Sequence, residues 1–195
     1  MTGRAELRTE RLVLRRWRPE DREPFAALNA DPEVMRWFPK LLNREESDAL
    51  VDRIEAAFER DGFGFWAVEV PGGEPFIGFV GLGPVPFEAH FTPAVEIGWR
   101  LVRSAWGRGY ATEAARRVLD ASFHSFDLDE VVSYTVAGNR RSRRVMERLG
   151  MTRDPRDDFE HPLVEAGTAL TWHVLYRLSR TGFAAGAPGA ASPRG

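Results

Sequence analysis

The segment that most constrains the fold joins a strand pattern to a helix pattern through two closely spaced glycines. Residues 95–101, Val-Glu-Ile-Gly-Trp-Arg-Leu, have the pattern of a strand. Gly107 and Gly109 follow, and a helix is expected to begin near Tyr110. Glycine lets the backbone turn sharply and approach a ligand, and the first N–H groups of a helix have no partner within it. The segment therefore predicts a phosphate site between a strand and a helix.

Two widespread phosphate-binding motifs do not fit this segment. The sequence contains no Gly-x-x-x-x-Gly-Lys-Ser/Thr run, so a Walker loop is excluded. A dinucleotide fingerprint would need a third glycine where Thr112 stands. Taken alone, the segment is also compatible with an ordinary strand–turn–helix connection.

Composition restricts the class of protein further. The absence of cysteine excludes disulfides, thiolate metal ligands and a cysteine nucleophile. A net charge of −2 gives no electrostatic case for nucleic acid binding. No apolar run approaches the ~20 residues of a membrane span, and residues 1–6 lack the apolar core of a signal peptide. We expect a cytoplasmic protein that contacts neither membrane nor nucleic acid.

The order of the predicted elements indicates a mixed α/β fold in one domain over residues 9–178. A capping box of Asn43 and Glu46 starts one helix, which Gly62 ends. The low-complexity segment 179–195 predicts a disordered tail. The expected strands are 11–17, 65–70, 76–82, 95–101, 130–136, one from Met151 and 171–178. The expected helices are 19–30, 43–60, 110–122 and 139–149.

A second informative segment runs from Asn139 to Gly150. Asn139 is a good helix N-cap, and Ser142 shares a face with Val145 and Met146 in the helix that follows. A hydroxyl at the positive end of a helix suits an anionic neighbour, although it could equally satisfy local backbone. Among the nearby arginines, Arg144 is our candidate for a phosphate contact; the alternative is a solvated helix face.

The two segments together resemble the GNAT superfamily of acyl-CoA-dependent N-acyltransferases. Its Gln/Arg-x-x-Gly-x-Gly/Ala pattern is met in part, by Arg103 and Gly107 or by Gly107, Gly109 and Ala111. The tighter form of the motif has arginine where this chain has Trp106. Residues 139–150 resemble the Asn-x-x-Ser-x-x-Val-x-Glu-x-Leu-Gly segment of the RimJ/RimL-like branch. The resemblance spans about residues 9–178 and implies a mostly antiparallel twisted sheet of about seven strands, flanked by about four helices.

The resemblance implies an acetyl-CoA-dependent N-acetyltransferase, without metal, that acts on a protein N-terminus or a small-molecule amine as a monomer or homodimer. Backbone N–H groups near Leu101 and Val102 would hold the pantetheine chain, and Ser142 would donate a hydrogen bond to the sulfur. The residues expected to bind acetyl-CoA are Leu101, Val102, Arg103, Gly107, Arg108, Gly109, Tyr110, Ala111, Thr112, Asn139 and Arg144.

For the general base we choose Glu96, since a carboxylate among apolar residues can have its pKa raised toward neutrality. A structural ion pair is the alternative role for Glu96, and His161 and His173 are further candidates for the base. The acidic loop 157–160 either attracts a cationic amine or is simply solvated. Two other functions remain open: a non-catalytic acyl-CoA-binding or regulatory module, and a generic nucleotide-binding domain.

Overall fold

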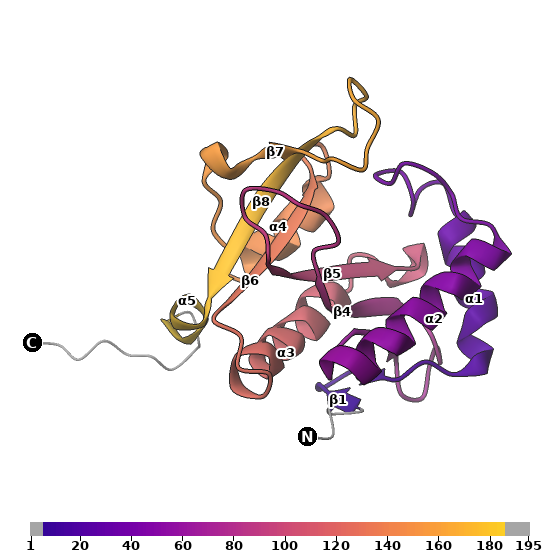
Figure 1. Ribbon diagram of the computed structural model, residues 1–195. Helices are drawn as coiled ribbons and strands as arrows, with labels where there is room; N and C mark the ends of the chain where they lie inside the picture. The colour runs from indigo at the N-terminus through magenta and orange to yellow at the C-terminus, as the bar shows by residue number, and fades with distance from the viewer. Residues whose placement is uncertain (1–5, 186–195) are drawn as a thin grey trace, which may run out of the picture.

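One sheet of eight strands runs through the molecule in the order β1-β2-β3-β4-β5-β6-β8-β7 (Figure 1). The computed structural model describes residues 6–185. Strands β5 and β6 are parallel, and every other neighbouring pair is antiparallel. The strands are β1 (Glu6–Arg8), β2 (Val13–Arg15), β3 (Phe65–Glu69), β4 (Gly78–Pro84), β5 (Val95–Leu101), β6 (Glu130–Val136), β7 (Phe159–Glu160) and β8 (Trp172–Ser179).

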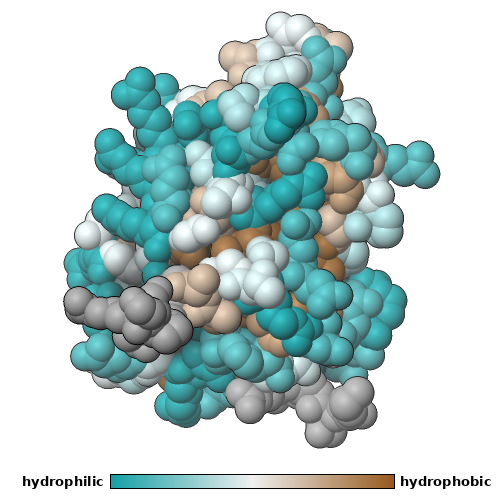
Figure 2. Space-filling model, turned by 90° about the vertical axis from the view of Figure 1, so that its left-hand side faces the viewer, coloured by the Kyte–Doolittle hydropathy of each residue, from teal (hydrophilic) through white to brown (hydrophobic). Residues whose placement is uncertain are grey.

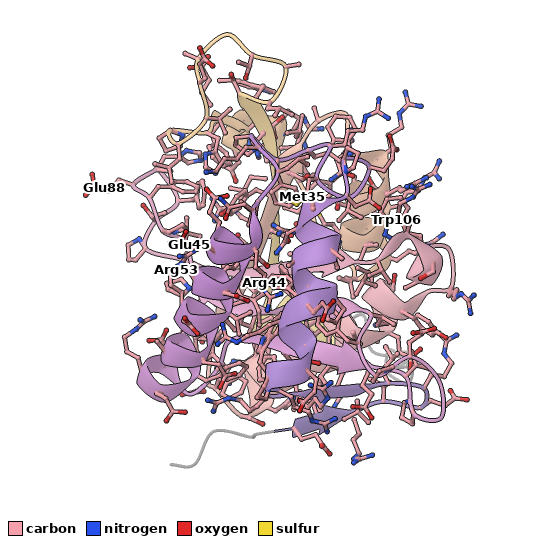
Figure 3. The ribbon with its side chains drawn as sticks, turned by 90° about the vertical axis from the view of Figure 1, so that its right-hand side faces the viewer. Met35, Arg44, Glu45, Arg53, Glu88 and Trp106 are labelled. Atoms are coloured by element: carbon pink, nitrogen blue, oxygen red, sulfur yellow. The ribbon has the colours of Figure 1, made fainter. Side chains whose placement is uncertain are left out.

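Helices cover both faces of the sheet. Helices α1 (Arg22–Ala30) and α2 (Arg44–Asp61) lie side by side over one face (Figure 3). Helix α1 contacts Phe79 of β4 and Arg100 of β5, whose side chains lie on one face of the sheet. Helix α3 (Tyr110–His124) also contacts β4 and β5, so it packs on the opposite face. The remaining helices are α4 (Arg140–Arg148) and α5 (Arg180–Ala185).

Local sequence signals place the helix ends as expected. The Asn43 side chain accepts a hydrogen bond from the Glu46 N–H, and the Glu46 carboxylate accepts one from the Asn43 N–H, each at 2.9 Å. Gly62 then ends α2 in the left-handed conformation, with a φ of 76°. Within residues 6–185, no helix is both long and apolar enough to cross a bilayer.

The fold is the mixed α/β architecture predicted, with local differences. Strand β1 was not expected, and the strand expected over residues 11–17 is confined to β2. Instead of a strand from Met151 there is a single bridge between Thr152 and Arg177, because the acidic segment after it turns away before the chain returns as β7. The sheet thus has eight strands rather than about seven, and residues 6–185 form five α-helices rather than about four.

The disordered tail predicted from Ser179 is wrong for its first seven residues. Ser179 ends β8, and α5 follows it. The Arg180 side chain bonds Asp127 at 2.7 Å, and the Phe183 ring lies 5.3 Å from that of Phe123, so tertiary contacts order this segment. The remainder of the predicted tail, 186–195, lies outside the described residues.

The core lies between the sheet and its helices. On the face shown in Figure 2, hydrophilic side chains cover most of the surface and apolar ones appear mainly in the recesses between them. The aromatic cluster after α1 divides into two parts. Met35 is buried in the core, whereas Trp37 and the exposed Phe38 form part of a cavity wall.

Candidate active site

The central feature of the site is a split in the sheet between β5 and β6. These parallel strands pair at one position, Glu96 with Val132, and then diverge toward their carboxyl ends (Figure 1). Just before the split widens, the Ser133 hydroxyl donates a 2.9 Å hydrogen bond to the Ile97 carbonyl. Helices α3 and α4 follow β5 and β6 along the chain, so both helix N-termini open toward the split.

The register of β5 decides which of its backbone groups face the split. The Val102 N–H donates to the Ile77 carbonyl at 2.9 Å, on the side of β4. Since N–H groups alternate in direction along a strand, those of Trp99 and Leu101 point away from β4, into the split. Val102 was the wrong choice for holding pantetheine by its N–H, because that group is already bonded within the protein.

A cavity of about 1110 Å³ fills the split. Its lining includes consecutive β5 residues from Glu96 to Leu101, which point to alternate faces, so the cavity reaches both sides of the sheet. The predicted site residues that line it are Glu96, Leu101, Gly107, Gly109, Tyr110, Ala111, Thr112, Asn139, Ser142 and Arg144.

Three predicted cofactor residues lie outside this lining. Besides Val102, they are Arg103, whose guanidinium lies 3.9 Å from Asp31, and Arg108, whose carbonyl accepts a 3.2 Å hydrogen bond from Arg11. Arg103 and Arg108 are exposed, because the turn that carries them faces outward. Arg103 and Arg108 therefore contribute their backbone to the loop, and their side chains do not enter the cavity.

The glycine loop has the geometry of an anion site. Gly107 and Gly109 have φ values of 76° and 82°, in the left-handed region that favours glycine. Within residues 6–185, no protein acceptor bonds the N–H groups of Tyr110, Ala111 and Thr112, the first three of α3. The helix dipole adds partial positive charge at this end, so the loop offers a converging set of donors to phosphate.

Trp106, the residue that departs from the tighter family motif, closes the loop onto β5. Its indole Nε1–H donates to the Leu101 carbonyl at 2.9 Å, and the Arg141 guanidinium lies 4.3 Å above its ring. Both side chains line the cavity. Trp106 thus positions the loop through a hydrogen bond, and Arg141 brings a positive charge from α4 toward the same place.

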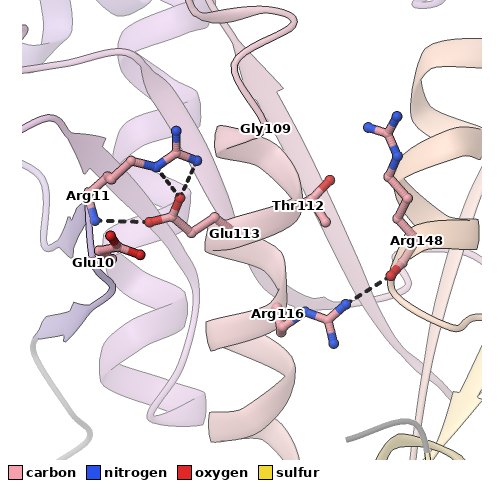
Figure 4. A pocket seen from close by; sticks show the side chains of 7 residues that line it. All are labelled: Glu10, Arg11, Gly109, Thr112, Glu113, Arg116 and Arg148. Carbon is pink, nitrogen blue, oxygen red and sulfur yellow. Dashed lines mark hydrogen bonds and ion pairs between the residues drawn. The ribbon is translucent and has the colours of Figure 1, made fainter. Parts of the chain in front are cut away.

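A smaller pocket lies on the outer side of the glycine loop (Figure 4). On one side of α3, the Arg11 Nε donates to the Glu113 carboxylate at 2.7 Å. On the other side, the Arg116 guanidinium donates to the Arg148 carbonyl at 2.9 Å. The Arg148 side chain lines both this pocket and the large cavity, which extends the positive surface beyond the loop.

Ser142 lies in the first turn of α4, where Asn139 fixes it. The Asn139 Oδ1 accepts from the Ser142 N–H at 3.3 Å, and its Nδ2 donates to the Ser142 Oγ at 3.2 Å and to the Thr135 Oγ1 at 3.0 Å. Because the hydroxyl oxygen already accepts from Asn139, its own proton is directed toward another acceptor. Ser142 therefore presents an O–H donor to the cavity from a positive helix end.

Glu96 faces the cavity from the edge of the split. Burial raises the pKa of its carboxyl to about 7, and hydrogen bonding to the Tyr134 hydroxyl opposes part of that rise. Burial, together with the Glu96 charge, raises the pKa of Tyr134. Within residues 6–185, no ion pair includes Glu96, so the alternative role as a structural ion pair is not supported.

The two candidate histidines lie together near Glu96 in the cavity wall. Their ring centroids are 4.8 Å apart. Burial and the neighbouring His173 lower the pKa of His161 to about 4, and burial lowers the pKa of His173. Both rings are therefore neutral at pH 7, and His161 is too weak a base to compete with Glu96.

The raised pKa of Glu96 predicts a pH-dependent stability difference. Between the ordinary carboxyl value near 4.5 and about 7, the folded chain holds a proton that the unfolded chain releases, so stability falls as pH rises through this window. Glu96→Gln removes this penalty. Thermal unfolding should show a larger gain in Tm for Glu96→Gln at pH 8 than at pH 5; an equal gain at both pH values would contradict the raised pKa.

Sequence reasoning missed two cavity residues, Tyr134 and Arg100. Tyr134 lies on β6, opposite Glu96, and only the pairing of two strands distant in sequence brings the two side chains together. Arg100 belongs to the same β5 face as Glu96, two alternations along. The signal available for Arg100 was its place four residues after Glu96 in an otherwise apolar strand, because residues an even number apart share one face.

Comparison with known proteins agrees with this geometry. Residues 11–152 match the family described as an acetyltransferase (GNAT) domain. The chain is 35% identical over 161 residues to the FsC-acetyl coenzyme A-N(2)-transacetylase of Aspergillus fumigatus, covering 78% of this chain and 68% of that protein. It is 31% identical over 152 residues to the uncharacterized protein YkkB of Bacillus subtilis, covering 77% and 87% of the two chains.

A solved acetyltransferase from Agrobacterium tumefaciens superposes with a TM-score of 0.72 at 29% identity, covering 89% of this chain and 93% of that one. The split sheet, the free N–H groups of the glycine loop and these matches agree on one assignment. The chain belongs to the GNAT family of acetyltransferases.

Proposed function

We propose that this GNAT acetyltransferase moves the acetyl group of acetyl-CoA to a primary amine, within the RimJ/RimL-like branch. One observation carries the proposal: a cavity that crosses the sheet joins phosphate-binding N–H groups on the α3 side to the carboxylate of Glu96 on the other face. The branch assignment rests on the segment from Asn139 to Gly150.

The residues of the cavity fit acetyl-CoA. The N–H groups of Tyr110, Ala111 and Thr112 would bind the pyrophosphate, and the cations of Arg144 and Arg148 lie in the same lining. The Leu101 N–H group, which like that of Trp99 points into the split, would hold a pantetheine amide as an additional strand would. Acetyl-CoA supplies the activated acetyl group; binding, orientation and proton transfer fall to the protein.

Glu96 would act as the base. A carboxylate with a pKa near 7 accepts a proton from an ammonium group, directly or through water, far better than one with an ordinary pKa. The Tyr134 hydroxyl, bonded to Glu96, orients the carboxylate toward the cavity. Backbone N–H groups of the split, Trp99 among them, would stabilise negative charge that develops on the thioester oxygen.

Ser142 would donate its O–H to the departing sulfur. A serine hydroxyl is a weaker acid than a thiol, so its role is stabilisation of the thiolate rather than full protonation. Two features direct the donor: the Asn139 side chain, which fixes the hydroxyl oxygen, and the positive end of α4.

Loss of the Ser142 hydroxyl should lower kcat with little change in acetyl-CoA affinity. A hydrogen bond to a charged group contributes about 1.5–3 kcal/mol, so Ser142→Ala should reduce kcat by about 10- to 100-fold. Steady-state rates of thiol release measure the effect. Ser142→Thr keeps a hydroxyl and serves as the matched control. Full activity in Ser142→Ala would exclude the role.

The proposed reaction is tested by thiol release from acetyl-CoA across a panel of amines, beside an unfolding scan with acetyl-CoA. Ligand at ~100 times its Kd should stabilise the fold by about 2.7 kcal/mol. Release with one class of amine supports an N-acetyltransferase. Stabilisation without release from any amine would favour the non-catalytic acyl-CoA-binding module, and equal stabilisation by ATP would favour a generic nucleotide-binding domain.

A further inference from the structure

Arg100 lies on the same face of β5 as Glu96, with Gly98 between them. Four residues of extended strand separate the two by ~13 Å between Cα atoms. Gly98 has no side chain, and the Phe65 ring lies against it, since a Cβ there would approach the ring to 3.3 Å. All three β5 residues line the cavity, on the face that α1 covers.

Several contacts hold the Arg100 guanidinium in place, and within residues 6–185 no carboxylate pairs with it. Its Nη1 donates to the Asn29 Oδ1 at 2.5 Å, and the buried Asn29 is fixed in turn by a 2.9 Å hydrogen bond to Ser47. The Phe38 and Phe79 rings lie 4.1 Å and 5.3 Å from the guanidinium carbon. The Arg100 Nε is buried with no acceptor in the part of the chain described.

Such an arrangement lowers the stability of the fold, because the half-buried guanidinium is partly desolvated without a counter-ion. Burial lowers the pKa of Arg100 to about 10, so the guanidinium still carries its charge at neutral pH. Its rigid support and unused donors are the properties of a site built to receive an anion.

The other charged side chains of the cavity lining favour an anionic group on the ligand. Its carboxylates are Glu33 and Glu96, whereas six arginines line it: Arg36, Arg100, Arg140, Arg141, Arg144 and Arg148. Two of the three carboxylates in the acidic loop that we considered as an attractor of cationic amines pair with arginines outside the cavity lining. Asp157 pairs with Arg177 at 2.7 Å and Asp158 pairs with Arg153, and neither carboxylate lines the cavity.

We propose that the amine acceptor carries a carboxylate, which Arg100 binds while the amine lies toward Glu96. The proposal rests on the proposed N-acetyltransferase function and names its substrate class, an amino acid or a related amino carboxylate. A monoanion is the expected partner. Arg100 is a single cation on its face of β5. Arg141 and Arg148 of α4 lie toward the glycine loop, where we place the cofactor phosphates.

Matched pairs of acceptors test this directly. Amino acids with the amine and carboxylate at increasing separation are compared with their amides and with diamines, at fixed acetyl-CoA, by thiol release. The carboxylate form should have the higher kcat/KM by about 10- to 100-fold, because a charge-assisted hydrogen bond is lost in the amide. Equal rates for acid and amide, or a preference for diamines or for phosphoethanolamine, would overturn the proposal.

Arg100→Met should abolish the discrimination between acid and amide while leaving acetyl-CoA binding intact. Its Tm should be measured beside that of wild type, because removing a charge without a counter-ion favours the fold, whereas loss of the hydrogen bond to the buried Asn29 Oδ1 disfavours it. Arg100→Lys keeps the charge but lacks the planar fork, and should retain part of the preference. Arg36→Met, which removes another cavity arginine stacked on Trp37, is the matched control and should keep the full preference.

A binding measurement separates this proposal from the proposed reaction. Calorimetry with N-acetyl amino acids and their amides, on the protein saturated with CoA, requires no turnover. The carboxylate site is supported if wild type binds the acid more tightly than the amide while Arg100→Met binds the two equally. This holds even if no amine releases thiol, because the absence of thiol release would exclude only the proposed reaction. Equal binding of acid and amide by wild type overturns the carboxylate site whether or not amines are acetylated.

Discussion

Glu96→Gln is expected to lower kcat by about 10²- to 10⁴-fold, the usual contribution of a positioned general base. The amide keeps the size of the side chain and a hydrogen bond to Tyr134, but it cannot accept a proton. Affinity for acetyl-CoA should remain unchanged, because the N–H groups that we propose to hold it lie on β5 and in the glycine loop. Rates of thiol release and a ligand-dependent Tm shift measure the two quantities on the same protein.

The pH profile distinguishes a base from a structural carboxylate. In wild type, kcat/KM should rise as pH increases through about 7, where Glu96 loses its proton. In Glu96→Gln that limb should disappear, leaving only the rise due to deprotonation of the free amine. Glu33→Gln, which removes the other cavity carboxylate, serves as the control. A wild-type profile preserved in Glu96→Gln would exclude Glu96 as the base.

Gly109→Val is expected to raise the Kd for acetyl-CoA by about 10- to 100-fold. Gly109 has a φ of 82°, and a β-branched residue is strained in that region. Relaxation of the turn would move the N–H groups of Tyr110 and Ala111 off the pyrophosphate. Each charge-assisted bond contributes about 1.5–3 kcal/mol, so loss of one is enough for the predicted change. Titration with acetyl-CoA by calorimetry measures it.

Gly62→Val provides a matched control for backbone strain. Gly62 ends α2 with a φ of 76°, and an added Cβ would meet no atom within 4 Å. The two substitutions should lower Tm by similar amounts, while only Gly109→Val weakens acetyl-CoA binding. An equal loss of affinity in both variants would show that general destabilisation, rather than the phosphate loop, is responsible.

The sequence alone determined the elements around the cofactor. The strand 95–101, the helix start at Tyr110 and the cap at Asn139 all depend on short-range chemistry: glycine in left-handed turns, an Asn side chain bonding the N–H three residues on, and alternating or helical apolar spacing. These preferences act within a few residues, so they can be recognised in the amino-acid sequence.

Only the tertiary structure decided which groups meet in the cavity. The divergence of β5 from β6 frees the Trp99 and Leu101 N–H groups and places Tyr134 against Glu96. The register with β4 occupies the Val102 N–H, although Val102 adjoins the motif in sequence. Strand pairing, burial and the pKa of Glu96 arise from contacts between residues far apart in the chain. Local preferences do not encode such contacts, and folding alone establishes them.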